Sequence, residues 1–128
     1  MRVSATDWLE SGWTLENTVN LATELAKLEV DLLDCSSGGI ISGVNIPVKL
    51  GYQVSLAAEV KQKTSLKTGA VGLITQPEQA EEILQKGYAD LIFLGRPLLS
   101  DPYWTYRADQ MLKAKSQVYP VQYQRALS

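Results

Sequence analysis

The stretch Ala89-Asp90-Leu91-Ile92-Phe93-Leu94-Gly95-Arg96-Pro97 decides the fold. Its centre, 91–94, is an unbroken apolar run without polar alternation, which is typical of a strand buried on both faces of a parallel sheet. The run ends in a glycine, which lets the backbone approach a ligand closely, and an arginine, which supplies a planar fork of donors. At the carboxyl end of a parallel strand, this pair predicts a phosphate site. Taken alone, the pair is better explained by a turn glycine and a surface ion pair; the rest of the chain reverses that preference.

The composition excludes several classes of protein. The chain has 128 residues, 45% of them hydrophobic, and a net charge of -2, so it fits one globular domain without strong electrostatic capture of nucleic acid or anionic membrane. No apolar run approaches the about 20 residues that a membrane helix needs. A single cysteine, Cys35, excludes an internal disulfide, and the absence of histidine excludes Ser-His and Cys-His catalysis and disfavours zinc. No signal peptide is recognised, so a cytoplasmic location is expected.

Strand-like and helix-like segments alternate along the chain. The predicted strands are 2–5, 30–35, 66–72 and 91–94, and the predicted helices are 14–28, 53–63, 75–86 and 101–113. Thr14, Thr75 and Asp101 are predicted N-terminal caps of helices, and Glu78 is predicted to complete a capping box with Thr75. Gly87 is predicted to end the third helix in the left-handed region. The tail, 115–128, shows no clear periodicity.

Strictly alternating strands and helices indicate an α/β protein with a parallel sheet and right-handed crossovers. Two architectures remain open at this point. One is a small doubly wound sheet, and the other is part of a (β/α)8 barrel. A complete barrel typically needs about 250 residues, so four units in this chain would be half of one.

Candidate ligand residues accompany each predicted strand. They are Arg2 with Ser4, then Ser36-Ser37-Gly38, then Gly69 to Gly72, then Gly95-Arg96. In both architectures the ligand site lies at the carboxyl ends of the strands, where backbone N–H groups can point at an anion. Each glycine alone is also explained by a simple turn, but the four groups on one predicted face support a common site.

The sequence resembles the old yellow enzyme family, in particular its bacterial branch of NADPH dehydrogenases, which are FMN-dependent ene-reductases. The resemblance is collinear from residue 2 to about residue 125, and it covers the C-terminal half of that family's barrel, strands five to eight. It rests on Arg2-Val3-Ser4-Ala5-Thr6-Asp7, Asp31-Leu32-Leu33-Asp34-Cys35-Ser36-Ser37-Gly38, Gly51-Tyr52-Gln53-Val54, Thr68-Gly69-Ala70-Val71-Gly72, and Ala89-Asp90 through Gly95-Arg96 with Asp101-Pro102. It implies one half-barrel over 1–128 whose last part, 115–128, is a C-terminal tail.

The resemblance also implies roles for individual residues. Arg2 would lie by the N1/C2 carbonyl edge of the flavin, the alternative being a strand-end arginine paired with a carboxylate. Ser36 and Gly38 would belong to the loop after the sixth strand, which runs past the ribityl chain and the phosphate of the flavin. The alternative is that they form a simple turn. The phosphate itself would be clamped by Gly72, Gly95 and Arg96. Cys35 is expected to be a buried strand-end residue without a redox role.

The tail Pro120-Val121-Gln122-Tyr123-Gln124-Arg125 resembles the C-terminus of the same branch. There the arginine reaches into the neighbouring protomer's active site, with the tyrosine beside it. The resemblance therefore implies that Arg125 is a second catalytic residue beside Arg2. The alternative is a frayed chain end.

Parts of the family's site are missing from this chain. The carbonyl-holding His-His or His-Asn pair and the tyrosine proton donor belong to earlier strands. The sequence therefore predicts an FMN- and NADPH-dependent oxidoreductase for α,β-unsaturated carbonyls that is incomplete here and inactive alone. Its expected partners are an enone substrate and either further copies of itself or a complementary N-terminal half-barrel, with no nucleic acid and no membrane. Two alternatives remain: a non-catalytic half-barrel that binds FMN or phosphate and self-associates, and an unrelated phosphate-binding α/β domain.

Overall fold

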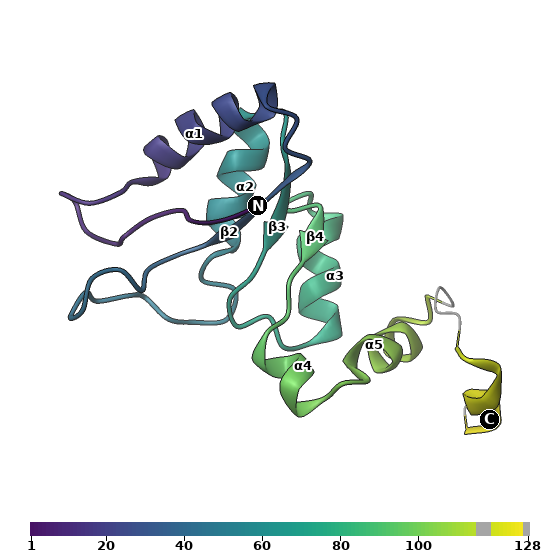
Figure 1. Cartoon of the computed structure of the whole chain (residues 1–128). Coiled ribbons are helices and arrows are strands. Elements are labelled where there is room, and N and C mark those ends of the chain that lie inside the picture. Colours follow the sequence, from purple (N-terminus) through teal and green to yellow (C-terminus); the bar gives the residue numbers. More distant parts are fainter. Residues whose placement is uncertain (115–118, 127–128) are drawn as a thin grey trace.

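The structure is a computed structural model, and it describes residues 1–114 and 119–126. Its centre is a four-stranded parallel sheet in the order β1-β2-β3-β4 (Figure 1). The strands are β1 (Arg2–Ser4), β2 (Leu32–Ser36), β3 (Lys67–Ala70) and β4 (Leu91–Ile92). The helices are α1 (Leu15–Lys27), α2 (Val54–Lys63), α3 (Pro77–Gln85), α4 (Arg96–Ser100), α5 (Trp104–Leu112) and the 3₁₀ helix η1 (Val121–Ala126).

The strand order follows the chain order. Each strand pairs in parallel with the next, as in the registers Val3 with Cys35 and Cys35 with Ala70. The predicted alternation of strands and helices is therefore confirmed. A doubly wound sheet reverses its direction of growth at a switch point, and this sheet does not, so the doubly wound alternative is wrong.

The hydrophobic core lies between the sheet and helices α1, α2 and α3. Side chains alternate across a strand, so Leu33 and Cys35 on β2 share one face, and both are fully buried. Ala57 and Val60 of α2 and Ala22 of α1 belong to the same core cluster. Burial of this face holds the three crossover helices against the sheet.

The other side of the sheet is called here the inner face. Pleating and register assign to it Arg2 and Ser4 of β1, Asp34 of β2, Gly69 of β3 and Leu91 of β4. Leu91 is 51% exposed, so the prediction that 91–94 forms a strand buried on both faces is wrong. The reason is that β4 is the last strand of the sheet, and helices α1, α2 and α3 pack on the opposite face.

Helix starts differ from the predictions in two places. Thr14 caps α1 with a capping box to Asn17, as expected for its position. Thr75 does not cap α3: Gln76 is the cap residue, and α3 begins at Pro77, which leaves Thr75 one residue too early. Asp101 does not cap α5, which begins three residues later.

The predicted helix 101–113 is two helices with different boundaries. The short α4 occupies 96–100 and was not predicted, because Pro97 and the preceding apolar run obscure its period. Asp101 ends α4, and its side chain accepts a hydrogen bond from the N–H of Tyr103 at 3.1 Å. Gly87 has φ of +70° after α3, which confirms the predicted left-handed stop.

The C-terminal tail is described only in part, since the predicted segment 115–128 includes 115–118 and 127–128, which lie outside the described residues. Tyr119 stacks on Tyr106 of α5 with ring centroids 4.6 Å apart. The 3₁₀ helix η1 follows, and in Figure 1 it lies beyond α5, away from the sheet. Among the described helices, none combines the length and apolar character that crossing a membrane requires.

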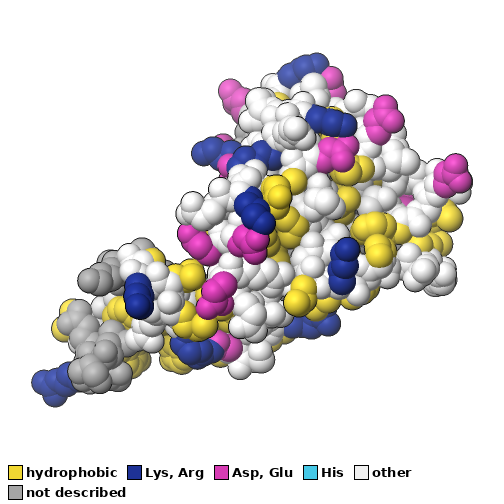
Figure 2. Space-filling model, turned by 180° about the vertical axis from the view of Figure 1, so that it is seen from behind, with side chains coloured by type: hydrophobic (Ala, Val, Ile, Leu, Met, Phe, Trp, Pro, Cys, Tyr) yellow, Lys and Arg dark blue, Asp and Glu magenta, His cyan; other side chains and the backbone are white. Residues whose placement is uncertain are grey.

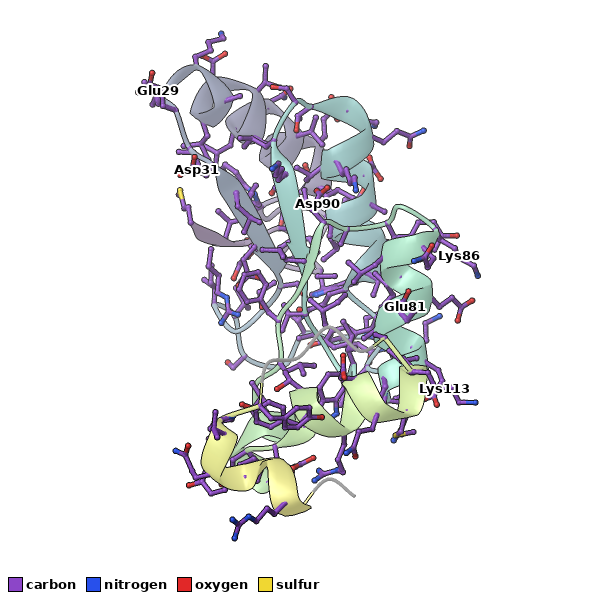
Figure 3. All side chains as sticks on the ribbon, turned by 90° about the vertical axis from the view of Figure 1, so that its right-hand side faces the viewer. Glu29, Asp31, Glu81, Lys86, Asp90 and Lys113 are labelled. Carbon is purple, nitrogen blue, oxygen red and sulfur yellow. The ribbon has the colours of Figure 1, made fainter. Side chains whose placement is uncertain are left out.

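An ion pair joins helix and strand at the amino end of the sheet. Asp90, just before β4, accepts a 2.9 Å contact from Lys61 of α2 and a 2.8 Å hydrogen bond from the N–H of Thr68. Figure 3 shows Asp90 beside the strands of the sheet, while Glu29 and Asp31 lie at the turn after α1. Asp90 therefore fastens α2, β3 and β4 together at the end opposite the candidate site.

Candidate functional site

A cavity of about 620 Å³ opens at the carboxyl ends of β3 and β4. Its walls come from the loop after β3, from the residues after β4, and from the helices that follow. The lining residues are Val71, Gly72, Leu73, Ile74, Thr75, Phe93, Gly95, Arg96, Pro97, Ser100, Asp101 and Trp104. Three of the predicted phosphate residues, Gly72, Gly95 and Arg96, are thus brought together at one place.

The β3–α3 loop, defined here as residues 71–75, has an uncommon backbone. Gly72 has φ of +112°, and the next residue, Leu73, has φ of +49°. A branched residue rarely adopts that conformation, which is typical of loops that serve a function. Among the described residues, the N–H groups of Gly72, Leu73 and Ile74 donate to no acceptor. Successive free N–H groups of this kind form a concavity suited to an anion.

Arg96 supplies the charge of the cavity. Its side chain is exposed, and among the described residues its guanidinium makes no hydrogen bond or ion pair. Asp101 is the other ionised group among the lining residues, and Arg107 neutralises it in an ion pair. The cavity therefore carries a net positive charge, and Gly95 leaves open space next to Arg96 because a Cβ there would meet nothing within 4 Å.

Ser36 and Gly38 lie at the carboxyl end of β2, outside this cavity. Gly38 has φ of +70°, and a Cβ there would come within 2.7 Å of Ile46. Its carbonyl accepts a hydrogen bond from Ser4 at 3.2 Å, and its N–H donates to the carbonyl of Thr6 at 3.0 Å. The two residues therefore sit on the same edge of the sheet as the cavity, next to the loop after β1.

Arg2 is the first residue of β1, in agreement with the predicted strand 2–5. Its register partner is Asp34 in the middle of β2. The Nε of Arg2 donates to Oδ2 of Asp34 in an ion pair, with the Arg2 side chain 60% exposed and that of Asp34 8% exposed. The pairing with a carboxylate, which the sequence left as the alternative role, is thus present on the inner face.

Arg125 does not join the other predicted residues. It is an exposed residue of η1 and does not line the cavity. Nearby, Tyr123 lines a second hollow of about 280 Å³ together with Tyr103, Tyr106 and Tyr119. The structure therefore separates the tail from the two loops that build the site.

Cys35 is fully buried on the core face of β2. Burial raises the pKa of its thiol to about 12, and the neighbouring charge of Asp34 acts in the same direction. At neutral pH the thiol is protonated and inert. The prediction that Cys35 has no redox role agrees with this environment.

A series of hydrogen bonds that was not predicted from the sequence leads from the loop after β1 to the β3–α3 loop of the site. Trp8 Nε1 donates to Ser37 Oγ at 2.9 Å, and Ser37 donates in turn to Oε1 of Gln53. Gln53 Nε2 then donates to the carbonyl of Val71 at 3.1 Å. These three hydrogen bonds join the loops after β1, β2 and β3. The sequence signal was the motif at 51–54, whose glutamine precedes an apolar helix face.

The fold and the cavity define a parallel α/β protein with a cavity at the carboxyl ends of its strands, the edge at which such proteins bind their ligands. The chain belongs to the NADH:flavin oxidoreductase / NADH oxidase family, whose model matches residues 1–115. This membership confirms the resemblance to the old yellow enzymes and places the chain in a family of oxidoreductases.

Three curated relatives named NADPH dehydrogenase are similar to the chain. It is 44% identical to the Bacillus subtilis protein over 98% of the chain and 36% of the relative. For Geobacillus thermodenitrificans the values are 45%, 98% and 36%, and for Bacillus licheniformis they are 47%, 98% and 37%. The chain thus spans little more than a third of the length of these relatives.

Solved structures support the fold alone. A complex of 2-naphthoyl-CoA reductase superposes with a TM-score of 0.74 at 23% identity, over 87% of this chain and 18% of that one. Histamine dehydrogenase from Rhizobium superposes with a TM-score of 0.72 at 24% identity, over 87% of this chain and 16% of that one. The arrangement of strands and helices therefore recurs as a segment of much larger enzymes.

Proposed function

We propose that the chain is the C-terminal half of the barrel of an FMN-dependent NADPH dehydrogenase that reduces α,β-unsaturated carbonyl compounds. In this proposal β1 to β4 are strands five to eight of a (β/α)8 barrel. The observation that carries it is the cavity in which Gly72, Gly95 and Arg96 meet at the carboxyl ends of the last two strands. Phosphate sites of barrels are frequently built at this position.

The residues of the cavity fit a phosphate monoester such as that of FMN. Free N–H groups of Gly72, Leu73 and Ile74 offer donors, and Arg96 offers a charged fork that no described group occupies. Gly95 leaves room for close approach. When bound, FMN would carry hydride from NADPH to the activated alkene.

The remaining roles extend along the same edge of the sheet. Ser36 and Gly38 would hold the ribityl chain and the near side of the phosphate. Arg2 would bind the edge of the flavin ring and stabilise negative charge on it, because Asp34 engages only its Nε and, among the described residues, its terminal nitrogens make no hydrogen bond. Arg125 would complete a neighbouring protomer's site.

The residues of this chain do not supply every group that the proposed reaction needs. The chain has no histidine, so it offers no imidazole to hold a substrate carbonyl. The inner face and the edges of β1 and β4 have no partner in the described residues. We therefore include in the proposal a partner that covers them, either a separate N-terminal half-barrel or further copies of this chain.

A second candidate function is a non-catalytic half-barrel that binds FMN or phosphate and self-associates. The observation that favours it is the amount of hydrophobic surface: exposed hydrophobic side chains lie between charged ones over the face seen in Figure 2. Leu91 on the inner face is an example, at 51% exposure. Such surface is typical of proteins that associate.

The proposed function is tested by titrating the full 128-residue chain into FMN and following the quenching of flavin fluorescence. Saturable binding that is tighter for FMN than for riboflavin would support the phosphate site. Equal affinity for the two flavins, or none for either, would refute it. Adding an N-terminal half from a relative, and assaying NADPH consumption with an enone, then separates the enzyme from the non-catalytic alternative.

A further inference from the structure

Two glutamine side chains contact the β3–α3 loop from opposite ends. Gln53, the cap residue of α2, donates from Nε2 to the carbonyl of Val71 at 3.1 Å. Gln79, in the first turn of α3, donates from Nε2 to the carbonyl of Leu73 at 3.2 Å, and its Oε1 accepts from the N–H of Thr75 at 3.1 Å. Three backbone groups of a five-residue loop are therefore bound by side-chain carboxamides.

Between these contacts lie the two residues with positive φ, Gly72 and Leu73. Leu73 has no conformational preference for this region, and such a backbone persists only where its surroundings fix it. Gln53 also fills the space beside Gly72, since a Cβ there would come within 2.6 Å of Gln53 Nε2. The glutamines thus supply fixed partners on both sides of the strained residues.

Gln53 is itself held in place. It is 2% exposed, and its Oε1 accepts the hydroxyl of Ser37, which in turn accepts the indole N–H of Trp8. A buried carboxamide with both ends bound has one favoured orientation. The loops after β1 and β2 therefore determine where Gln53 presents its donor to the loop after β3.

We propose that Gln53 and Gln79 are positioning residues that hold the β3–α3 loop in its anion-binding conformation. Neither side chain lines the cavity. Each acts through the backbone, by keeping the N–H groups of Gly72, Leu73 and Ile74 directed away from internal acceptors. This inference rests on the proposed function, because the anion concerned is the phosphate of FMN.

The test compares FMN, riboflavin and inorganic phosphate binding to the full chain and to the variants Gln53→Met, Gln79→Met and the double variant. Methionine keeps the length of the side chain and removes its hydrogen bonds. We expect FMN to bind the double variant about tenfold more weakly, equivalent to about 1.4 kcal/mol, with riboflavin changed less than about twofold. Gln85→Met is the matched control, since the side chain of this exposed glutamine of α3 hydrogen-bonds, among the described residues, to Glu81 alone.

A rescue experiment separates positioning from general stabilisation. Glycine adopts positive φ without cost, so Leu73→Gly in the double variant should recover at least about threefold of the lost FMN affinity. Leu73→Ala removes the same side chain and keeps the strain, so it should recover none. If the double variant does not fold, Gln79→Met carries the same comparison, because Gln79 is only half-buried.

The outcomes are distinguishable. A selective loss of affinity for FMN over riboflavin, recovered by Leu73→Gly, supports the inference. Equal weakening of FMN and riboflavin, or the absence of rescue, would overturn it while leaving the proposed function intact. A wild-type chain that binds FMN no better than riboflavin would instead refute the proposed function on which the inference rests.

Discussion

The aromatic ring of Phe93 lies directly over the Cα of Gly69, so that a Cβ at position 69 would overlap the ring carbons Cδ2 and Cε2. Gly69 belongs to β3, and Phe93 follows β4 and lines the cavity. The absence of a side chain at Gly69 therefore sets how closely the ring packs against the sheet beside the candidate site.

Gly69→Ala should destabilise the fold by about 1–3 kcal/mol, because the added methyl must displace the Phe93 ring. The measurement is the midpoint of urea unfolding. Combining it with Phe93→Leu should remove much of this cost, since the smaller side chain can move aside. Costs that simply add in the double variant would show that the two residues do not compete for space.

Arg96→Ala should weaken FMN far more than riboflavin, since riboflavin lacks the phosphate. Loss of a charge-assisted hydrogen bond typically costs about 1.5–3 kcal/mol, or roughly tenfold or more in affinity. Fluorescence titration with both flavins measures the difference. Arg96→Lys is the control that keeps the charge and should retain part of the affinity. Equal weakening of both flavins in Arg96→Ala would place this side chain away from the phosphate.

Asp90 should make the stability of the fold depend on pH. Burial alone would raise the pKa of its carboxyl, but the hydrogen bonds from Lys61 and from the Thr68 N–H, with the charge of Lys61, lower it below the ordinary value of 3.8. A depressed pKa adds stability that is complete above the unfolded pKa. That stability is lost as the pH falls from about 5 towards the folded pKa.

Asp90→Asn should therefore lower the free energy of unfolding at pH 7 and flatten its fall below about pH 5. Urea unfolding at several pH values measures both effects. Asp31→Asn is the matched control, because Asp31 is exposed and lies apart from Asp90 in Figure 3. If the free energy of unfolding of Asp90→Asn followed the same pH profile as that of the wild type, the Asp90–Lys61 ion pair would contribute nothing to the pH dependence of stability.

The isolated chain should not be a stable monomer. The edges of β1 and β4 leave backbone groups unpaired, and the inner face lacks a covering layer within the described residues. Light scattering should report species larger than the 14.1 kDa of one chain. A monodisperse monomer that unfolds cooperatively would contradict this expectation.

The chain alone should show negligible NADPH-dependent reduction of cyclohexenone-type substrates, even with excess FMN. It lacks a carbonyl-holding histidine pair, and general acid catalysis alone is worth about 10²–10⁴-fold. An added N-terminal half that docks should restore turnover, and Arg2→Ala should then lower it. Robust turnover by the 128-residue chain would show that the missing half is dispensable.

Much of the fold could be predicted because it depends on local patterns. The apolar runs and the glycine at position 87 mark the alternating elements, and Thr14 caps its helix through residues close in sequence. The meeting of Gly72 with Gly95 and Arg96 could also be predicted, since parallel strands end on one edge.

Two of the predictions that were wrong or missing concern residues whose environment is set by segments distant in sequence. The exposure of Leu91 depends on what covers the inner face, which no local pattern reports. Gln53 looks like an ordinary polar helix residue until the loops after β1 and β2 bury it. Thr75 carries good capping chemistry, but its N–H is bound by Gln79 and the helix starts at Pro77. For Leu91 and Gln53, tertiary surroundings outweigh the local preference, whereas for Thr75 the competing contact is with a residue only four positions away.

The sequential strand order has a consequence for how the protein is made. Because each strand pairs with the one synthesised just before it, every βα unit leaving the ribosome finds its partner already present. The sheet can then grow in the direction of translation, without waiting for distant segments to meet. Of the four described strands, β4 is synthesised last, so it joins a sheet whose other three strands can already be paired.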